Sequence, residues 1–194
     1  MPSPPMLRNR RGLRQNPGPL NTRKEALSMT ANFDSIQPVV KTVTVACTPE
    51  DAFRYFTADF GMWWPIATHS VVAYASEFKD KPAALIFETH LGGRIIERTR
   101  SGEEYVLGTV LAWEPPARVA FSFHPGRDAK EAQTVEVTFS SVPEGARVVL
   151  IHSGWEKLST NAQKSRDSYN QGWEPVFVTA YREYAQKRKQ SQEE

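Results

Sequence analysis

Two hydrophobic periods divide the chain beyond residue 38. Up to residue 153 most apolar and polar residues alternate in short runs, with the period of two that marks a half-buried strand. The alternation is clearest at Val119-Phe121-Phe123 and at Val135-Val137-Phe139, where polar residues lie between the apolar ones. We predict seven strands, at residues 39–46, 84–90, 93–100, 105–113, 118–124, 134–142 and 147–153.

The breaks between the last six strands carry residues that favour tight turns. Examples are Gly92-Gly93, Pro115-Pro116 and Pro143-Glu144-Gly145. Parallel neighbours would need crossovers of a dozen or more residues, so links this short predict an antiparallel meander.

A helix is predicted between the first two strands. Thr48 can cap its free N–H groups, Pro49 suits the first helical position, and Asp51 takes the capping-box position. We expect the helix to stop near residues 59–61 and to lead into an aromatic-rich connection at residues 62–65.

The last segment changes to a helical period and carries one aromatic stripe. Its members recur every three or four residues over about 20 residues: Tyr169, Trp173, Val176, Phe177, Ala180, Tyr181 and Tyr184. Gly172 and Pro175 interrupt the pattern, and we expect a kink or a restart there. The stripe needs an apolar partner, and the concave face of the sheet is available. The sequence therefore predicts an α+β fold, a curved antiparallel sheet wrapped around a long C-terminal helix.

The length of 194 residues fits one domain with tails. Residues 1–35 are rich in Pro, Arg, Asn and Gly and show no apolar period, which predicts a disordered basic tail. We place the domain at residues 36–188 and a disordered C-terminal tail at 189–194. Met29 is a second possible start, just ahead of the domain.

Charge and composition narrow the function classes. The whole chain has a formal net charge of +2, but residues 1–28 carry +5, which leaves −3 for the rest. A nucleic-acid-binding domain would carry its basic stripe within the fold, so nucleic acid is not expected as a partner. No run approaches the roughly 18 apolar residues of a membrane span. The single cysteine, Cys47, excludes an internal disulfide and favours a cytoplasmic protein.

Several local strings resemble one protein family when taken in order. The strings are Phe60-Gly61-Met62-Trp63-Trp64-Pro65, His69-Ser70-Val71, Gly92 to Arg98, Gly108 to Arg118, and His152-Ser153-Gly154-Trp155-Glu156. Together they resemble the activator-of-heat-shock-ATPase homologue-like family of the START-like (SRPBCC) superfamily, also called polyketide cyclase and lipid-transport proteins. The resemblance covers residues 39 to about 185. It implies a helix-grip fold (START or Bet v-like) with a cavity between sheet and last helix. Members include ligand binders, cyclases, hydratases and a co-chaperone. The co-chaperone has an additional N-terminal domain, and the first 38 residues of this chain are too few and too polar to form one.

Motifs for metal or cofactor chemistry are missing from the sequence. His69, His90, His124 and His152 lie on separate predicted elements, without the pair spacing that places two ligands on one helix face. There is no Gly-x-Ser-x-Gly elbow, no phosphate-binding loop and no dinucleotide fingerprint. We therefore predict no metal and no cofactor.

The charges most relevant to a site lie on the strand at 93–100. Alternation puts Arg94, Ile96 and Arg98 on one face and Ile95, Glu97 and Thr99 on the other. A charge facing the cavity would bind a polar head group or act as an acid or base. The alternative is a solvated ion pair on the convex face.

Aromatic residues supply the remaining candidates for the cavity. Two adjacent tryptophans, Trp63 and Trp64, lie on a Gly- and Pro-bounded connection, where one can cover the cavity mouth. For Trp113 and Trp173 ordinary core packing is the alternative. The full candidate set is Trp63, Trp64, Arg94, Glu97, Trp113, Phe121, Phe139, Trp173, Phe177 and Tyr181.

Three functions remain open from the sequence. The first is binding of a small apolar or aromatic molecule in the cavity, lined by the sheet and by the helix stripe at Tyr169, Trp173, Phe177 and Tyr181. The second is a cyclase- or hydratase-like enzyme in the same cavity, with Glu97 or His90 as acid or base and Arg94 stabilising negative charge. The third is a co-chaperone-like interaction module, with a chaperone or a second copy of the chain as partner.

Overall fold

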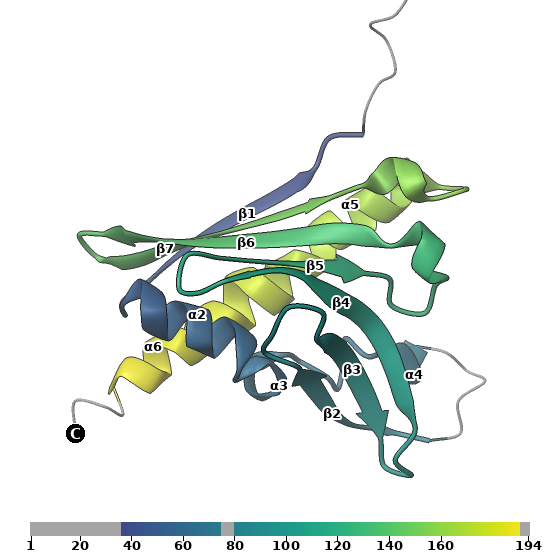
Figure 1. Cartoon of the computed structure of the whole chain (residues 1–194), viewed down its shortest axis with the longest axis horizontal. Coiled ribbons are helices and arrows are strands. Elements are labelled where there is room, and N and C mark those ends of the chain that lie inside the picture. Colours follow the sequence, from purple (N-terminus) through teal and green to yellow (C-terminus); the bar gives the residue numbers. More distant parts are fainter. Residues whose placement is uncertain (1–35, 75–79, 191–194) are drawn as a thin grey trace, which may run out of the picture. The chain divides into compact units, whose positions relative to one another are not determined.

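A seven-stranded antiparallel sheet and a long C-terminal helix dominate the computed structural model, which describes residues 36–74 and 80–190 (Figure 1). The spatial order is β1-β7-β6-β5-β4-β3-β2, so the six later strands form a meander and β1 pairs with the last of them. The strands are β1 Val39–Val45, β2 Pro82–Phe87, β3 Arg94–Thr99, β4 Glu104–Glu114, β5 Arg118–Phe123, β6 Gln133–Val142 and β7 Gly145–Ser153. The predicted number and order of strands is confirmed. The tail expected at 1–35 lies outside the described residues, and of the tail expected at 189–194 the first two residues belong to the C-terminal helix, whereas 191–194 lie outside the described residues.

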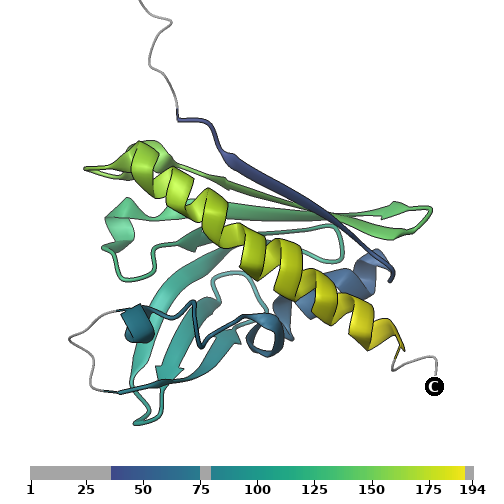
Figure 2. The same cartoon turned by 180° about the vertical axis from the view of Figure 1, so that it is seen from behind.

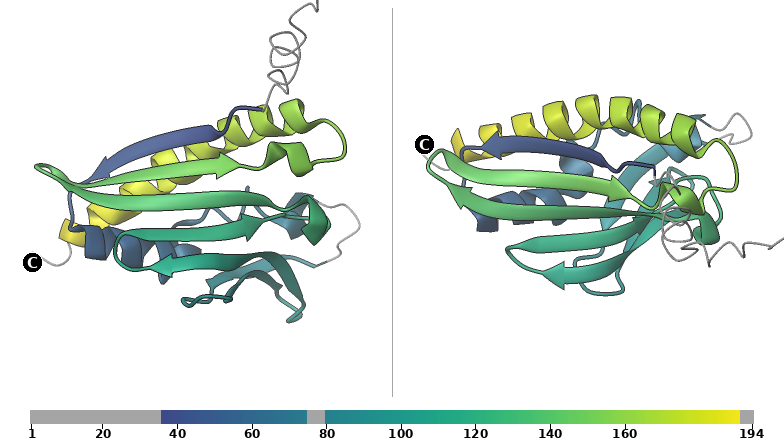
Figure 3. Two further views of the ribbon diagram at one scale, coloured as in Figure 1. Left: turned by 45° about the horizontal axis from the view of Figure 1, so that its top comes forward. Right: turned by 90° about the horizontal axis from the view of Figure 1, so that it is seen from above.

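The C-terminal helix crosses one face of the sheet along its whole length (Figure 2). It consists of α5 (Ala162–Trp173), a π-helical stretch η3 (Glu174–Tyr181) and α6 (Arg182–Gln190). The sheet curls around it, most strongly at β2 to β4 (Figure 3). This is the predicted helix-grip arrangement. The helix is longer than the stripe predicts because its first and last turns are polar and exposed.

The interruption expected at Gly172 and Pro175 takes the form of π-helical turns. Pro175 lies at the start of η3 and has no N–H to donate. In an α-helix its ring would clash with the carbonyl of residue 171, and we attribute the wider turns to relief of that clash. The helix therefore continues without a restart.

Helix α2 (Pro49–Thr57) lies against the same face of the sheet and begins as predicted (Figure 1). The Thr48 hydroxyl accepts a hydrogen bond from the Asp51 N–H at 3.2 Å. The expected irregular connection is partly helical, because α3 spans Phe60–Trp63. Gly61 allows α3 to lie close to β2, since a Cβ at this position would lie 2.3 Å from the Leu85 carbonyl oxygen of β2.

Side chains alternate between the two faces of the sheet as the period of two predicts. On β6 the residues Gln133, Val135, Val137 and Phe139 are buried under the helices, and those between them are more exposed. Register shifts on β3–β4 and β4–β5 add to the curl. No helix among the described residues is long and apolar enough to cross a membrane.

Candidate functional site

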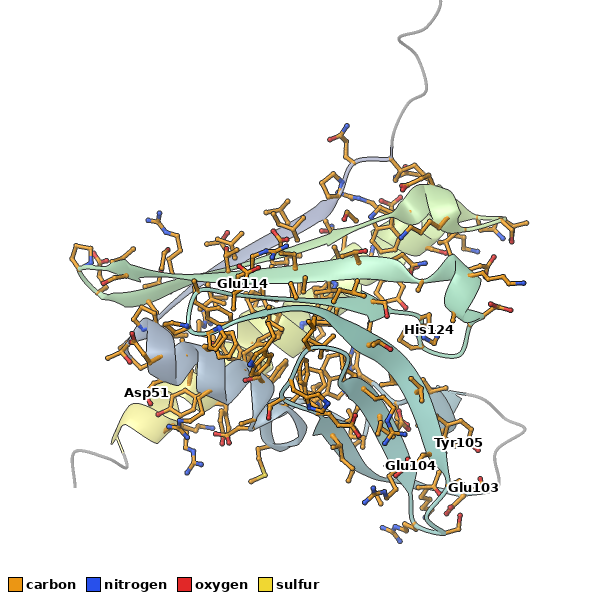
Figure 4. The ribbon with its side chains drawn as sticks, viewed as in Figure 1. Asp51, Glu103, Glu104, Tyr105, Glu114 and His124 are labelled. Atoms are coloured by element: carbon orange, nitrogen blue, oxygen red, sulfur yellow. The ribbon has the colours of Figure 1, made fainter. Side chains whose placement is uncertain are left out.

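A cavity of about 380 Å³ lies between the first half of the C-terminal helix and the curled part of the sheet. Its wall comes from the sheet, the helix, the segment after α3 and the loop after β5. The lining residues are Trp64, His69, Ser70, Val71, Glu97, Leu107, Phe123, Pro125, Gly126, Tyr169, Gly172, Trp173 and Val176. His124, labelled in Figure 4, marks the end of β5 from which that loop starts. The wall is mainly apolar with a few polar groups.

Four aromatic rings form a connected part of this wall. Trp64 lies 6.0 Å from Trp173 and 6.3 Å from Phe123, measured between ring centroids. Phe123 lies 6.2 Å from both Tyr169 and Trp173. The Trp64 indole N–H donates to the His69 carbonyl oxygen at 2.6 Å, which fixes its ring beside the helix. We call Trp64, Phe123, Tyr169 and Trp173 the aromatic wall.

Glu97 is the charged member of the lining and has only 1% of its surface exposed. Its carboxylate accepts hydrogen bonds from the Ser70 hydroxyl, from the Val71 N–H at 2.9 Å and from the Val72 N–H at 3.2 Å. These donors belong to the start of α4 (Val71–Tyr74), a single turn that the hydrophobic period did not predict. Glu97 therefore holds α4 against the cavity.

Two further polar side chains, His69 and Tyr169, line the cavity. The imidazole Nδ1 of His69 lies 3.0 Å from the Thr68 hydroxyl, and partial burial lowers the pKa of His69 below its ordinary value. Burial also raises the pKa of Tyr169, because the phenolate would lose its water. Both groups are therefore uncharged at neutral pH.

His152 lies directly behind the aromatic wall and is fully buried. Its Nδ1 accepts a hydrogen bond from the Trp173 indole N–H at 3.1 Å, and its ring centroid lies 4.9 Å from that of Tyr169. Burial lowers the pKa of His152 to about 3. The imidazole is thus neutral, and it fixes the orientation of Trp173.

The charged candidates of β3 are separated by the sheet. Glu97 faces the cavity, whereas Arg94 and Arg98 lie exposed on the other face. Arg94 pairs with Glu88 at 2.7 Å, and both arginines pair with Glu104, labelled at the start of β4 in Figure 4. His90 is exposed and also lies outside the cavity lining. The surface ion pair weighed as the alternative is what Arg94 forms.

Three of the ten ligand-binding candidates line the cavity, namely Trp64, Glu97 and Trp173. Of the tryptophan pair, Trp63 instead donates from its indole N–H to the Tyr55 carbonyl oxygen at 2.9 Å within the core. The five other aromatic candidates also pack in the core and are absent from the lining: Trp113, Phe121, Phe139, Phe177 and Tyr181.

Several lining residues were not among the candidates. His69 and Ser70 belong to a string used for the family resemblance, and Ser70 caps α4, since its hydroxyl accepts from the Ala73 N–H at 3.0 Å. Phe123 ends an alternating strand. Tyr169, outside the set of ten, was expected in the lining as part of the helix stripe and does line the cavity. A Ser before a short apolar run was the available signal for α4.

Comparison with known proteins identifies the family to which the chain belongs. The family model described as "Activator of Hsp90 ATPase homolog 1-like protein" matches residues 46–184. The chain belongs to this family. No curated protein matches the chain.

Solved structures of other proteins share the fold of this chain. A protein from Rhodobacter sphaeroides is 20% identical, with a TM-score of 0.53, and the match covers 79% of this chain and 93% of that one. The Aha1 dimer from Colwellia psychrerythraea is 15% identical, with a TM-score of 0.52, and the match covers 77% of this chain and 96% of that one. An anthrahydroquino-gamma-pyrone synthase, Txn09, is 32% identical, with a TM-score of 0.47, and the match covers 70% of this chain and 88% of that one.

Among the described residues, no group of three or more His, Cys, Asp or Glu side chains is arranged to hold a metal ion.

Proposed function

We propose that this domain binds a small, largely apolar molecule with an aromatic part in the cavity beneath the C-terminal helix. The observation that supports the proposal most is the cavity of about 380 Å³, which lies within the range of roughly 300 to 1,000 Å³ for small-molecule sites. Apolar residues make up most of its wall, and the polar groups are few. This is the composition of a ligand site, in which apolar area supplies affinity and polar groups supply orientation.

The aromatic wall favours a ligand with a ring or another flat apolar part. Trp64 and Trp173 are the two largest side chains of the lining, and their rings are nearly perpendicular, at 90°. Each indole N–H is already bonded to a protein acceptor, His69 O or His152 Nδ1. The two tryptophans therefore offer the ligand ring surface and no free donor, so their contribution is apolar contact.

Native mass spectrometry of the protein purified from its own host tests the proposal. We expect a stoichiometric bound compound that denaturation releases for identification. The same spectrum reports whether the chain forms a dimer, as the relative from Colwellia does. If the purified protein is empty and also binds neither neutral nor cationic aromatic probes in calorimetry, the proposal is wrong.

A second candidate function is catalysis of a proton transfer in the same cavity. The observation that favours it is that His69, Glu97 and Tyr169 are all titratable and all line one cavity. Catalytic acids and bases need such convergence on a bound ligand. Once the ligand is identified, turnover by the wild-type protein and its loss in His69→Gln would support this function, and an unchanged ligand after prolonged incubation would exclude it.

A further inference from the structure

Glu97 has the hydrogen-bonding pattern of an ionised carboxylate. Each of its oxygens accepts from a backbone N–H, which can only donate: Oε2 from Val71 and Oε1 from Val72, and Oε1 is also bonded to the Ser70 hydroxyl. Fixed donors on both oxygens favour the ionised carboxylate. Two carboxylate oxygens offer about four acceptor positions, so three donors leave one on Oε2, the oxygen that accepts only from Val71. The cavity wall therefore has one negative charge with acceptor capacity to spare.

Nothing among the described residues neutralises this charge. The ion pairs of the described part of the chain do not include Glu97. Arg94 and Arg98 of the same strand lie on the opposite face, where they pair with Glu88 and Glu104. His69, the other basic group of the lining, is neutral at neutral pH because burial lowers its pKa. A buried carboxylate without a counter-charge is costly, and a cation placed beside it would offset that cost.

The remaining wall is suited to the same kind of ligand. The aromatic wall places two indoles, a phenol ring and a phenyl ring around one cavity, and aromatic faces attract cations through their quadrupoles. This attraction is larger where water is excluded, and tryptophan is the strongest partner. A carboxylate that lines the same cavity as several aromatic rings is a chemical environment that distinguishes an organic cation from a neutral molecule of the same shape.

We propose that the ligand of this cavity is a small organic cation, a protonated amine or a quaternary ammonium compound with an apolar or aromatic body, whose charge lies against Glu97 and the aromatic wall. This inference rests on the proposed function, because it takes the cavity to be the ligand site. Glu97 then has two roles: it holds α4 through Ser70 and the two N–H groups, and it selects the charge of the ligand.

The test compares two probes of equal shape and different charge by calorimetry at low salt. The cation is benzyltrimethylammonium, and the neutral probe is its carbon isostere, neopentylbenzene. We expect the cation to bind the wild-type protein at least about tenfold more tightly than the isostere. A quaternary ammonium donates no hydrogen bond, so the ratio of the two affinities reports charge recognition alone.

Three variants assign the charge recognition to Glu97. Glu97→Gln removes the charge and loosens α4, whereas Ser70→Ala also loosens α4 but keeps the charge. Glu144→Gln removes a carboxylate at the β6–β7 turn, far along the chain from every lining residue, and controls for net charge. We expect the ratio of cation to isostere affinity to fall to about one in Glu97→Gln and to stay at the wild-type value in Glu144→Gln. In Ser70→Ala, which changes a lining residue, we expect both affinities to change together, so that the ratio stays well above one.

The possible outcomes separate this inference from the proposed function. If the isostere binds the wild-type protein as tightly as the cation, the cation inference is wrong and the ligand site remains. If neither probe binds and the protein from its host is empty, the proposed function fails and the inference fails with it. An equal loss of the ratio in Glu97→Gln and Ser70→Ala, or a preference for the cation that persists in Glu97→Gln, would overturn the selective role of Glu97.

Discussion

Gly172 is a position from which one substitution can fill the cavity. It lines the cavity from helix α5, and a Cβ added there meets no atom within 4 Å outside its own helix backbone. Its backbone conformation is helical, so a larger side chain adds no backbone strain. We expect Gly172→Leu to project its isobutyl group into the space that a ligand would occupy.

The expected stability change follows from two contributions. Replacing a helical glycine by alanine stabilises by about 1 kcal/mol, through the backbone entropy that glycine loses on folding. Leucine adds apolar burial of roughly 1 to 2 kcal/mol, less than the full value for a leucine because the site is not sealed. Gly172→Ala should therefore be about 1 kcal/mol more stable than the wild type, and Gly172→Leu about 2 to 3 kcal/mol more stable.

Binding should change in the opposite direction. We expect Gly172→Leu to weaken the binding of an aromatic probe by at least about tenfold, or 1.4 kcal/mol, and Gly172→Ala to bind with nearly wild-type affinity. Urea unfolding measures stability, and calorimetry measures affinity. A leucine variant that is less stable than the alanine variant would show that the space is absent. A leucine variant that is more stable but binds normally would place the ligand elsewhere.

Three other substitutions probe the surroundings of the site. Burial lowers the folded-state pKa of His152 to about 3, from its ordinary value of 6.5. As the pH falls from 6.5 toward 3, the His152 imidazole therefore takes up a proton in the unfolded chain but not in the folded one. The free energy of unfolding of the wild type should therefore fall by about 1.4 kcal/mol for each pH unit below 6.5 because of His152. In urea unfolding between pH 6.5 and 5, His152→Gln should lack this pH dependence. Gly108→Ala places a Cβ 1.8 Å from the Ser122 carbonyl oxygen, so thermal unfolding should show a destabilisation on the order of 3 kcal/mol, and a neutral result would contradict the geometry. Arg94→Ala should leave probe affinity unchanged, because its guanidinium lies outside the cavity; weaker binding would show that it reaches the ligand.

The fold followed from local patterns because each element carries its own signal. Alternation on β5 and β6, turn residues between strands and the Thr48 cap are all properties of neighbouring residues. The exceptions depend on contacts between distant segments. Helix α4 has one turn and is held by Glu97, 26 residues beyond Val71, and no hydrophobic period can show such a contact.

The site was harder to predict because a strand pattern separates two faces without saying which one is inside. Glu97 and Arg94 were equally good candidates from alternation alone. The curl of the sheet decides between them, since it turns Glu97 toward the helix and leaves Arg94 to pair with Glu88 and Glu104. The aromatic candidates met the same difficulty, because ring size is equally useful in a core and in a cavity wall.

The helix stripe shows how one pattern serves both purposes. Toward the C-terminal end, Phe177 and Tyr181 stack at 5.4 Å and pack against Phe56 of α2, and the Tyr181 hydroxyl donates to the Ala52 carbonyl oxygen at 2.8 Å. Toward the other end, Tyr169 and Trp173 line the cavity together with Gly172, which leaves room beside them. Helix α2 thus fills one half of the space between the sheet and the C-terminal helix, and the cavity lies in the other half. Substitutions at the α2 half should change stability first, and those between residues 169 and 176 should change ligand binding first.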